Sequence, residues 1–405
     1  MIANISYKNY KKSSDIHGTA LYPAVMVAPM QKEILRKLIE PNKTINIFDP
    51  FHGSGTSLYE SIEISKDVQL FGCDINPLAN LITKVKLQGI TENILTDIDT
   101  LEDLILDDNT SNNNHSFNNI NKWFRQDIIE SLSIIRRSIM QIDDSKNRLY
   151  FWYIMSDIIR KYSNTRSSTY KLHIKPLFSI ANIQNNVISD YLDSVKRNIS
   201  MFGCSYDNFK LYKSDILDKI EDFEDNSFDI SITSPPYGDN ATTVPYGQFS
   251  MLPLHWIDSK DLELEGWELD NYSKIDNASL GGKKRIANFN KFELDLLKPY
   301  LEQISHSKKQ KVINFFDDYF YFLKELCRVT NEYIVMTLGN RTVDGITINL
   351  TDITKKYIEN ERFANIDYGQ RQIPNKRIPS KTSKVNKKPV KSITHEYVII
   401  HKREK

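Results

Sequence analysis

The chain has 405 residues, and its 53 Lys and Arg balance its 52 Asp and Glu, so a net charge of +1 neither supports nor excludes a nucleic-acid partner. The hydrophobic content of 40% is enough for a buried core. Cys73, Cys204 and Cys327 lie far apart without metal-ligand spacing, which argues against a disulfide framework and a metal site. No run of about 20 apolar residues exists, so we expect no membrane span and a cytoplasmic location.

The first predicted elements alternate between strand and helix. After an irregular arm at residues 1–20, helical spacing begins near Met30, and a short β-branched strand follows at 44–50. A turn with two glycines leads into a helix. A second strand then ends at Asp74 and is followed by another helix. Short strands that alternate with helices are typical of a doubly wound α/β sheet.

This alternation stops after residue 88. The next segment is mostly helical in pattern, apart from an Asn-rich loop at 107–121, so we expect a helical insertion. Strands then resume, an irregular segment follows, and the chain ends in two strands separated by a long polar loop. We therefore expect a sheet domain built from 1–88, 206–240 and 313–405, a helical insertion at 89–205, and a second insertion at 241–312.

A glycine-containing motif, Asp-Pro-Phe-His-Gly-Ser-Gly-Thr, lies between the first strand and its helix. Gly53 and Gly55 allow the backbone to approach a ligand closely and to adopt positive φ. Asp74 follows Gly53 by 21 residues, a spacing that suits hydrogen bonds to a ribose diol. The third glycine of a dinucleotide motif and the lysine of a P-loop are both absent. The motif therefore predicts a nucleotide-type cofactor of another kind.

A second motif, Thr-Ser-Pro-Pro-Tyr-Gly, spans Thr233 to Gly238 directly after a predicted strand. Consecutive prolines fix a stiff turn at the carboxyl end of that strand, where ligands of open α/β sheets bind. Ser234 supplies a hydroxyl acceptor and Tyr237 a flat ring. An ordinary Pro-Pro turn with a packed tyrosine has the same composition, so this motif alone leaves both interpretations open.

Together the two motifs resemble those of the S-adenosylmethionine-dependent DNA amino-methyltransferases. The first is similar to the cofactor motif of that family. Ser234-Pro-Pro-Tyr is similar to the catalytic motif of the branch that methylates the N4 amine of cytosine, whereas the adenine-N6 branch more often begins with Asp or Asn. The resemblance implies a Rossmann-like seven-stranded sheet and direct methyl transfer to a base flipped out of double-stranded DNA. It also suggests a restriction-modification or related defence system, and allows a cognate restriction endonuclease as a partner.

The resemblance also implies roles for single residues. Segments at residues 22–35, 333–345 and 371–400 resemble further parts of the family, although the two insertions depart from its common arrangements. The expected catalytic residues are Ser234, Pro235, Pro236 and Tyr237. The expected cofactor-binding residues are Tyr22, Asp49, Phe51, Gly53, Gly55, Thr56, Asp74 and Asp215.

Basic clusters give the candidates for DNA binding, because Lys and Arg commonly contact phosphate. One cluster lies in 241–312, where Tyr246 and Gln248, together with Asn240 just before this segment, follow the catalytic motif, and we expect this segment to choose the sequence. The other lies in 371–391, which includes Arg371 and which we expect to supply affinity, although a solvated loop has the same charge pattern. The DNA-binding candidates are Lys283, Lys284, Arg285, Lys376, Arg377, Lys384, Lys387 and Lys388.

Three alternatives remain open from the sequence. The same chemistry can act on adenine N6, and an RNA guanine-N2 methyltransferase has a related motif. A non-catalytic DNA-binding protein can also keep this fold. A cytosine-C5 enzyme needs a nucleophilic Cys after a Pro, and none of the three cysteines follows one.

Overall fold

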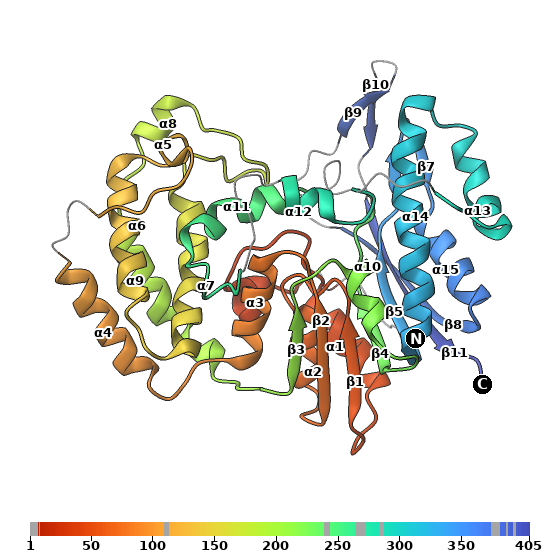
Figure 1. Ribbon diagram of the computed structural model, residues 1–405, viewed down its shortest axis with the longest axis horizontal. Coiled ribbons are helices and arrows are strands. Elements are labelled where there is room, and N and C mark those ends of the chain that lie inside the picture. Colours follow the sequence, from red (N-terminus) through yellow and green to blue (C-terminus); the bar gives the residue numbers. More distant parts are fainter. Residues whose placement is uncertain are drawn as a thin grey trace.

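The computed structural model describes residues 7, 9–108, 113–238, 244–264, 273–282, 287–373, 381–385, 388–391 and 394–405. Figure 1 shows two parts side by side, a sheet covered by helices and a group of helices on its left. Helices α11 (Tyr246–Trp256) and α12 (Ser273–Ala278) lie between these parts, above the sheet.

Seven strands of the described residues form one sheet in the order β3-β2-β1-β4-β5-β11-β8. The five strands from β3 to β5 are parallel, and β11 is antiparallel to both β5 and β8. Strand order reverses between β1 and β4, and ligands of such sheets bind beyond the carboxyl ends of the strands at this point. The strands are β1 (Ile45–Asp49), β2 (Val68–Cys73), β3 (Phe209–Tyr212), β4 (Phe228–Thr233), β5 (Thr330–Leu338), β8 (Phe363–Gln372) and β11 (His395–Arg403).

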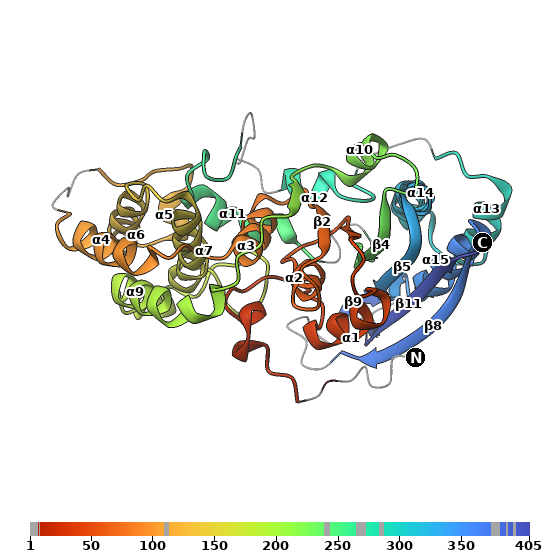
Figure 2. The ribbon, with the colours of Figure 1, turned by 90° about the horizontal axis from the view of Figure 1, so that it is seen from below.

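Both faces of the sheet are buried, because neighbouring residues of one strand enter different hydrophobic clusters. Ile47 of β1 packs in the cluster that contains α1 (Ala28–Leu38), α2 (Thr56–Ile62) and α3 (Pro77–Gln88). Phe48 packs in the cluster that contains α10 (Ile216–Lys219), α14 (His306–Val329) and α15 (Leu350–Asn360). Figure 2 shows α1 and α2 on one side of the sheet and α10 and α14 on the other. The predicted Rossmann-like α/β fold is confirmed.

The helical insertion shares its core with the sheet domain. Buried side chains of the insertion, such as Trp152, belong to the same cluster as Ile47. Helix α7 packs against α3 of the sheet domain, and α11 packs against both helices. The second insertion is therefore tied to the first. The helices of the first insertion are α4 (Ile94–Leu106), α5 (Ile120–Trp123), α6 (Gln126–Ile139), α7 (Ser145–Tyr162), α8 (Leu177–Ala181) and α9 (Val187–Asn198).

The described part of the arm is largely irregular, as expected, but Ile16, His17 and Ala20 are buried against the cluster of α1 and α2. One expectation was wrong in detail. The long polar loop before β11 contains the antiparallel ribbon β9 (Lys381–Val385) and β10 (Lys388–Lys391). Its lysines made a solvated loop the simplest interpretation, but Thr and Val between them favour strands.

The remaining elements are short, apart from one helix. They are η1 (Lys12–Ser14), η2 (Ile16–Gly18), η3 (Ile199–Phe202), η4 (Ile220–Asp222), the hairpin β6 (Arg341–Val343) and β7 (Ile346–Ile348), and helix α13 (Lys291–Leu301). Of the helices in the described part of the chain, none combines the length and the apolar character that a membrane crossing needs.

Candidate active site

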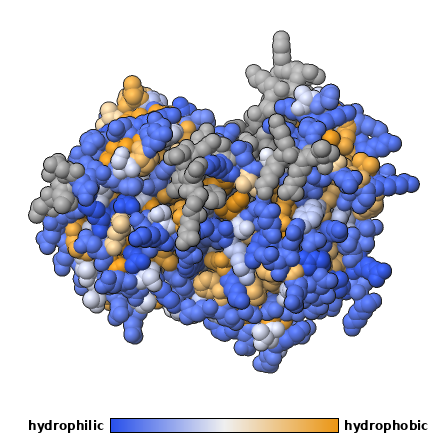
Figure 3. Space-filling view, viewed as in Figure 1, coloured by the Kyte–Doolittle hydropathy of each residue, from blue (hydrophilic) through white to orange (hydrophobic). Residues whose placement is uncertain are grey.

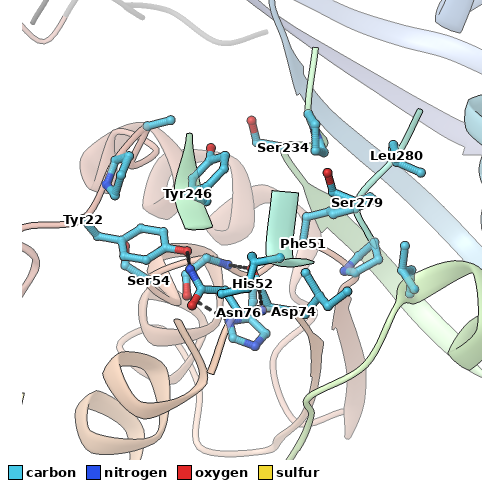
Figure 4. A pocket seen from close by; sticks show the side chains of 18 of the residues that line it. Tyr22, Phe51, His52, Ser54, Asp74, Asn76, Ser234, Tyr246, Ser279 and Leu280 are labelled. Carbon is cyan, nitrogen blue, oxygen red and sulfur yellow. Dashed lines mark hydrogen bonds between the residues drawn. The ribbon is translucent and has the colours of Figure 1, made fainter. Parts of the chain in front are cut away.

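A cavity opens to solvent at the carboxyl ends of β1, β2 and β4, and the space between its lining residues and at its mouth is about 820 Å³. Figure 4 shows that side chains from both sequence motifs, from the segment before α1 and from α11 converge on it. The predicted site residues among those that line it are Tyr22, Phe51, Gly53, Thr56, Asp74, Asp215, Ser234 and Pro236.

The turn after β1 depends on its two glycines. Gly53 has φ of 52° and Gly55 has φ of 71°, which is the left-handed region. A Cβ on Gly55 would also lie 2.6 Å from Thr83 Cγ2, because this turn packs closely on α3. Gly55 ends the turn and begins α2, so the backbone bends sharply at the wall of the cavity.

Asp74 lies at the end of β2 and is held by the same turn. Its carboxylate accepts hydrogen bonds from the backbone N–H of Gly53 at 3.0 Å and of Asn76 at 2.8 Å. Burial raises the pKa of Asp74, and these two donors oppose the rise. The structure therefore brings together Gly53 and Asp74, as the spacing predicted, and fixes the carboxylate at the edge of the cavity.

Asn76 joins three elements around the cavity, and the sequence analysis did not single it out. Its Nδ2 donates to Tyr22 Oη at 3.1 Å (Figure 4). It also donates to Ser250 Oγ at 2.7 Å. The Tyr22 ring lies 5.9 Å from that of Tyr246, which also lines the cavity. The sequence feature that could have pointed to Asn76 is its position as the N-cap of α3, directly before a Pro at the first position of that helix.

Asp49 lies behind the cavity and is not among the residues that line it. Thr233 Oγ1 donates to its carboxylate at 2.7 Å, Ser57 Oγ donates as well, and the Phe51 N–H donates at 3.1 Å. Burial raises the pKa of Asp49 to about 6, and the three donors favour its charged form. The structure assigns this carboxylate to linking the two motifs, because Thr233 directly precedes Ser234.

The second motif forms a turn at the opposite wall. Ser234 and Pro236 line the cavity, whereas Pro235 and Tyr237 are not among the lining residues. Ser234 Oγ lies 3.3 Å from Tyr237 Oη. Burial raises the pKa of Tyr237 above its ordinary value, so its hydroxyl stays protonated at neutral pH. Phe51 from the first motif packs edge to face against Phe322, with ring centroids 5.0 Å apart.

Two arginines lie beside this turn. A Cβ on Gly238 would lie 1.9 Å from Nη1 of Arg341, so the guanidinium packs directly on the end of the motif. Arg371 was expected in the basic loop, but it lies on β8 and is 9% exposed. Its Nε donates to Glu396 Oε2 at 2.8 Å. Arg371 is therefore part of a buried ion pair, and its assignment to a solvent-facing loop was wrong.

Lys86 of α3 forms a hydrogen bond with the first motif, and the sequence analysis did not predict this contact. The side chain is 2% exposed, and its Nζ donates to the carbonyl oxygen of Ser54 at 2.8 Å. Burial lowers the pKa of Lys86 to about 7. Lysines of amphipathic helices are mostly exposed, so the pattern of α3 gave no signal for a buried one.

Most of the expected DNA-binding residues cannot be placed around this site. Lys283, Lys284, Arg285, Lys376, Arg377, Lys387 and Asn240 lie outside the described residues. Lys384 belongs to β9 and Lys388 to β10 of the antiparallel ribbon. Gln248, also expected at the DNA, accepts a hydrogen bond from the Leu172 N–H at 3.2 Å.

The charge of the cavity restricts its ligand. Of the described residues that line it, Asp74 and Asp215 are the acids, and there is no Lys or Arg. Thr56 Oγ1 is buried at the wall without a hydrogen-bond partner among the described residues. A ligand with a positive charge and polar groups fits this lining better than one with phosphates. The described residues contain no group of three or more His, Cys, Asp and Glu that could hold a metal ion.

Comparison with known proteins finds a relative that aligns over nearly the whole chain. The chain is 30% identical to the Type II methyltransferase M.MvaI of Kocuria varians, over an alignment of 429 positions that covers 98% of this chain and 92% of that protein. None of the known protein-family models matches the chain. Solved structures of the rRNA methyltransferase aviRa from Streptomyces viridochromogenes align over 96% of the chain and 93% of theirs, at 10% identity and TM-scores of 0.32 and 0.33. Structural similarity at that level is too low to indicate a shared function.

Gly55→Ala should destabilise the fold through the first motif. The alanine must adopt a φ of 71° and its Cβ must displace Thr83, so we expect a loss of at least about 2 kcal/mol in the free energy of unfolding. Gly203→Ala is the matched control, because Gly203 has φ of −71° and no atom within 4 Å of the added Cβ. Equal midpoints of urea unfolding for the two variants would contradict this account of the turn.

Lys86→Met should change the pH dependence of stability. The pKa of Lys86 is about 7 in the folded chain, below its ordinary value of 10.5. Between these values the unfolded chain binds a proton that the folded chain does not, so this lysine makes stability rise with pH through that window. The variant should lose this part of the rise in urea unfolding, whereas Lys84→Met on the same helix should keep it. Identical pH slopes in wild type and Lys86→Met would show that the amine is not buried in this way.

Proposed function

Because the chain belongs to the type II methyltransferases, a family of DNA methyltransferases, we propose that it methylates the exocyclic N4 amine of cytosine at a specific site in double-stranded DNA. The observation that carries the proposal is that one cavity is lined by Gly53 and Asp74 on one side and by Ser234 on the other. A cofactor and an acceptor amine bound there would be neighbours, which a methyl transfer requires.

The lining of the cavity fits S-adenosylmethionine as the cofactor. When bound, this group supplies a methyl on a positively charged sulfur. Asp74 would accept hydrogen bonds from the ribose, Asp215 would hold the adenine, and the segment around Tyr22 would enclose the methionine end. The acidic lining and the unpaired Thr56 Oγ1 support this assignment, since the cofactor carries a cation and several polar groups but no phosphate.

Ser234 and Pro235 would prepare the amine. An exocyclic amine is a weak nucleophile, because its lone pair is delocalised into the ring. If Ser234 Oγ and the Pro235 carbonyl oxygen accept its two N–H groups, the nitrogen becomes more pyramidal and its lone pair more available. The Tyr237 hydroxyl, 3.3 Å from Ser234 Oγ, would hold the serine in place. No covalent intermediate with the chain is needed.

The target base has to leave the duplex to reach this cavity. Flipping costs a few kcal/mol and is offset by contacts to the base in the site. The Tyr237 ring is the surface on which we expect the base to stack. The β9–β10 ribbon and the segment 283–285 would bind the flanking duplex. A restriction-modification or related defence system, with a cognate restriction endonuclease, is the setting that fits this activity.

Asp74→Ala should weaken binding of S-adenosylmethionine by about 1.5–3 kcal/mol, the value of a hydrogen bond to a charged group. Isothermal titration calorimetry measures this directly. Asp67→Ala is the matched control, because Asp67 is exposed just before the first residue of the same strand. Unchanged affinity in a folded Asp74→Ala variant would remove Asp74 from the cofactor site.

Ser234→Ala should reduce kcat for methyl transfer to a DNA duplex by roughly 10²-fold, the cost of one lost transition-state hydrogen bond. Tyr237→Ala should be similar, and Tyr237→Phe milder because the ring survives. Cofactor affinity should stay close to wild type in all three. The readout is transfer of a labelled methyl group from the cofactor to DNA. Normal turnover of Tyr237→Ala would show that the base is not held by this ring.

A further inference from the structure

Acidic residues are unevenly distributed along this charge-balanced chain. The two longest stretches without Asp or Glu run from 158 to 189 and from 368 to 395. The second contains the β9–β10 ribbon, and the first belongs to the helical insertion. Figure 1 shows α8 of the insertion and the β9–β10 ribbon on opposite sides of the molecule, both at the end of the sheet where the cavity opens.

The first acid-free stretch contains an ordered loop, residues 165–174. An antiparallel bridge between Thr165 and Ile174 closes this loop, and the Arg166 N–H donates to the His173 carbonyl oxygen at 2.8 Å. The side chains of Arg166, Lys171 and His173 are exposed. The loop therefore has a defined backbone conformation, and its basic side chains face solvent.

This loop also rests on the helix that borders the candidate active site. The Leu172 N–H donates to Gln248 of α11, and the Tyr170 ring packs edge to face on Phe249 at 5.7 Å. Tyr246, at the first turn of α11, lines the cavity. A molecule bound on the loop would therefore be close to whatever occupies the cavity.

Two large apolar side chains project beside these cations. Leu177 is 83% exposed and Phe178 is 70% exposed, both on α8. Leu177 is the most exposed large hydrophobic residue in the described part of the chain. Figure 3 shows a hydrophobic projection over α8 at the upper left of the molecule. Exposed apolar pairs of this kind commonly mark binding surfaces.

We infer that this surface, which we call the insertion rim and define as residues 166–178, binds the DNA duplex across the cavity from the β9–β10 ribbon. Arg166, Lys171 and His173 contact phosphates, and Leu177 and Phe178 enter a groove of the duplex farther along from the flipped nucleotide. The inference rests on the proposed function, and it names the residues of the helical insertion that contact the DNA.

The basic side chains of this surface favour DNA over a protein as its partner. Phosphate backbones attract a surface that offers cations and no acid, and apolar side chains next to such cations enter grooves and contact base edges. The rim lies at the cavity end of the molecule, where a duplex with one base in the cavity has to pass.

The test compares two double variants with matched controls in the full-length protein. Arg166→Gln with Lys171→Gln should weaken binding to duplexes of any sequence and lower the log–log salt slope by about 0.9 per lost contact. Lys37→Gln with Lys43→Gln removes two exposed lysines on and after α1, near the amino end of β1, and should leave the slope unchanged. Fluorescence anisotropy with a random duplex gives both slopes.

The apolar pair is tested by specificity. Leu177→Ser with Phe178→Ser should lower kcat/KM on the methylated sequence about tenfold, the effect of losing one buried apolar contact, and leave binding to random duplex nearly unchanged. Leu95→Ser with Leu106→Ser is the control, because these leucines are 64% and 75% exposed on α4, at the other end of the insertion (Figure 1).

The outcomes separate this inference from the proposed function. If the wild type transfers methyl groups to DNA but both rim variants behave like their controls, the inference is wrong and the proposed function stands. If sedimentation shows that the Leu177 and Phe178 variant loses only self-association, the rim is a protein contact and the inference is again wrong. If the wild type neither binds nor methylates DNA, both fail.

Discussion

The buried carboxylate of Asp49 is the interaction on which the site depends. It accepts hydrogen bonds from Ser57 at the start of α2 and from Thr233 at the end of β4, and it is fully buried. Strands β1 and β4 are parallel neighbours, so the two motifs leave the sheet at the same edge. Sheet topology brings the motifs to one place, and this carboxylate fixes them against each other. A change at Asp49 would affect cofactor and target walls together, although Asp49 lines neither.

Much of the fold followed from the sequence, because short apolar strands alternate with amphipathic helices over the sheet domain. The spacing from Gly53 to Asp74 places both residues at the carboxyl ends of neighbouring strands, where the structure joins them by a hydrogen bond. Local sequence patterns could not predict which polar side chains would be buried and hydrogen-bonded in the folded protein. Lys86, Asn76 and Arg371 look like surface residues in the sequence, and only packing against distant segments buries them. The β9–β10 ribbon was missed for a related reason, because its charge outweighed its strand propensity.

The insertions are structural partners of the site. Helix α11 follows the catalytic motif, packs on α7 of the first insertion, and carries Tyr246 to the cavity. The first insertion thus stabilises the element that borders the target side. This arrangement explains why residues far apart in the chain, such as Tyr170 and Tyr246, are part of one region.

The measurement that tests the central claim most directly is the identity of the modified nucleoside. DNA incubated with the purified chain and S-adenosylmethionine is digested to nucleosides and analysed by mass spectrometry, and the modified positions are mapped by base-resolved sequencing. The account predicts N4-methylcytosine within a single sequence context, and its loss with Ser234→Ala. Finding N6-methyladenine would contradict the assignment of the target. Finding no modified base in DNA, with a folded protein that binds the cofactor, would contradict the assignment of the activity.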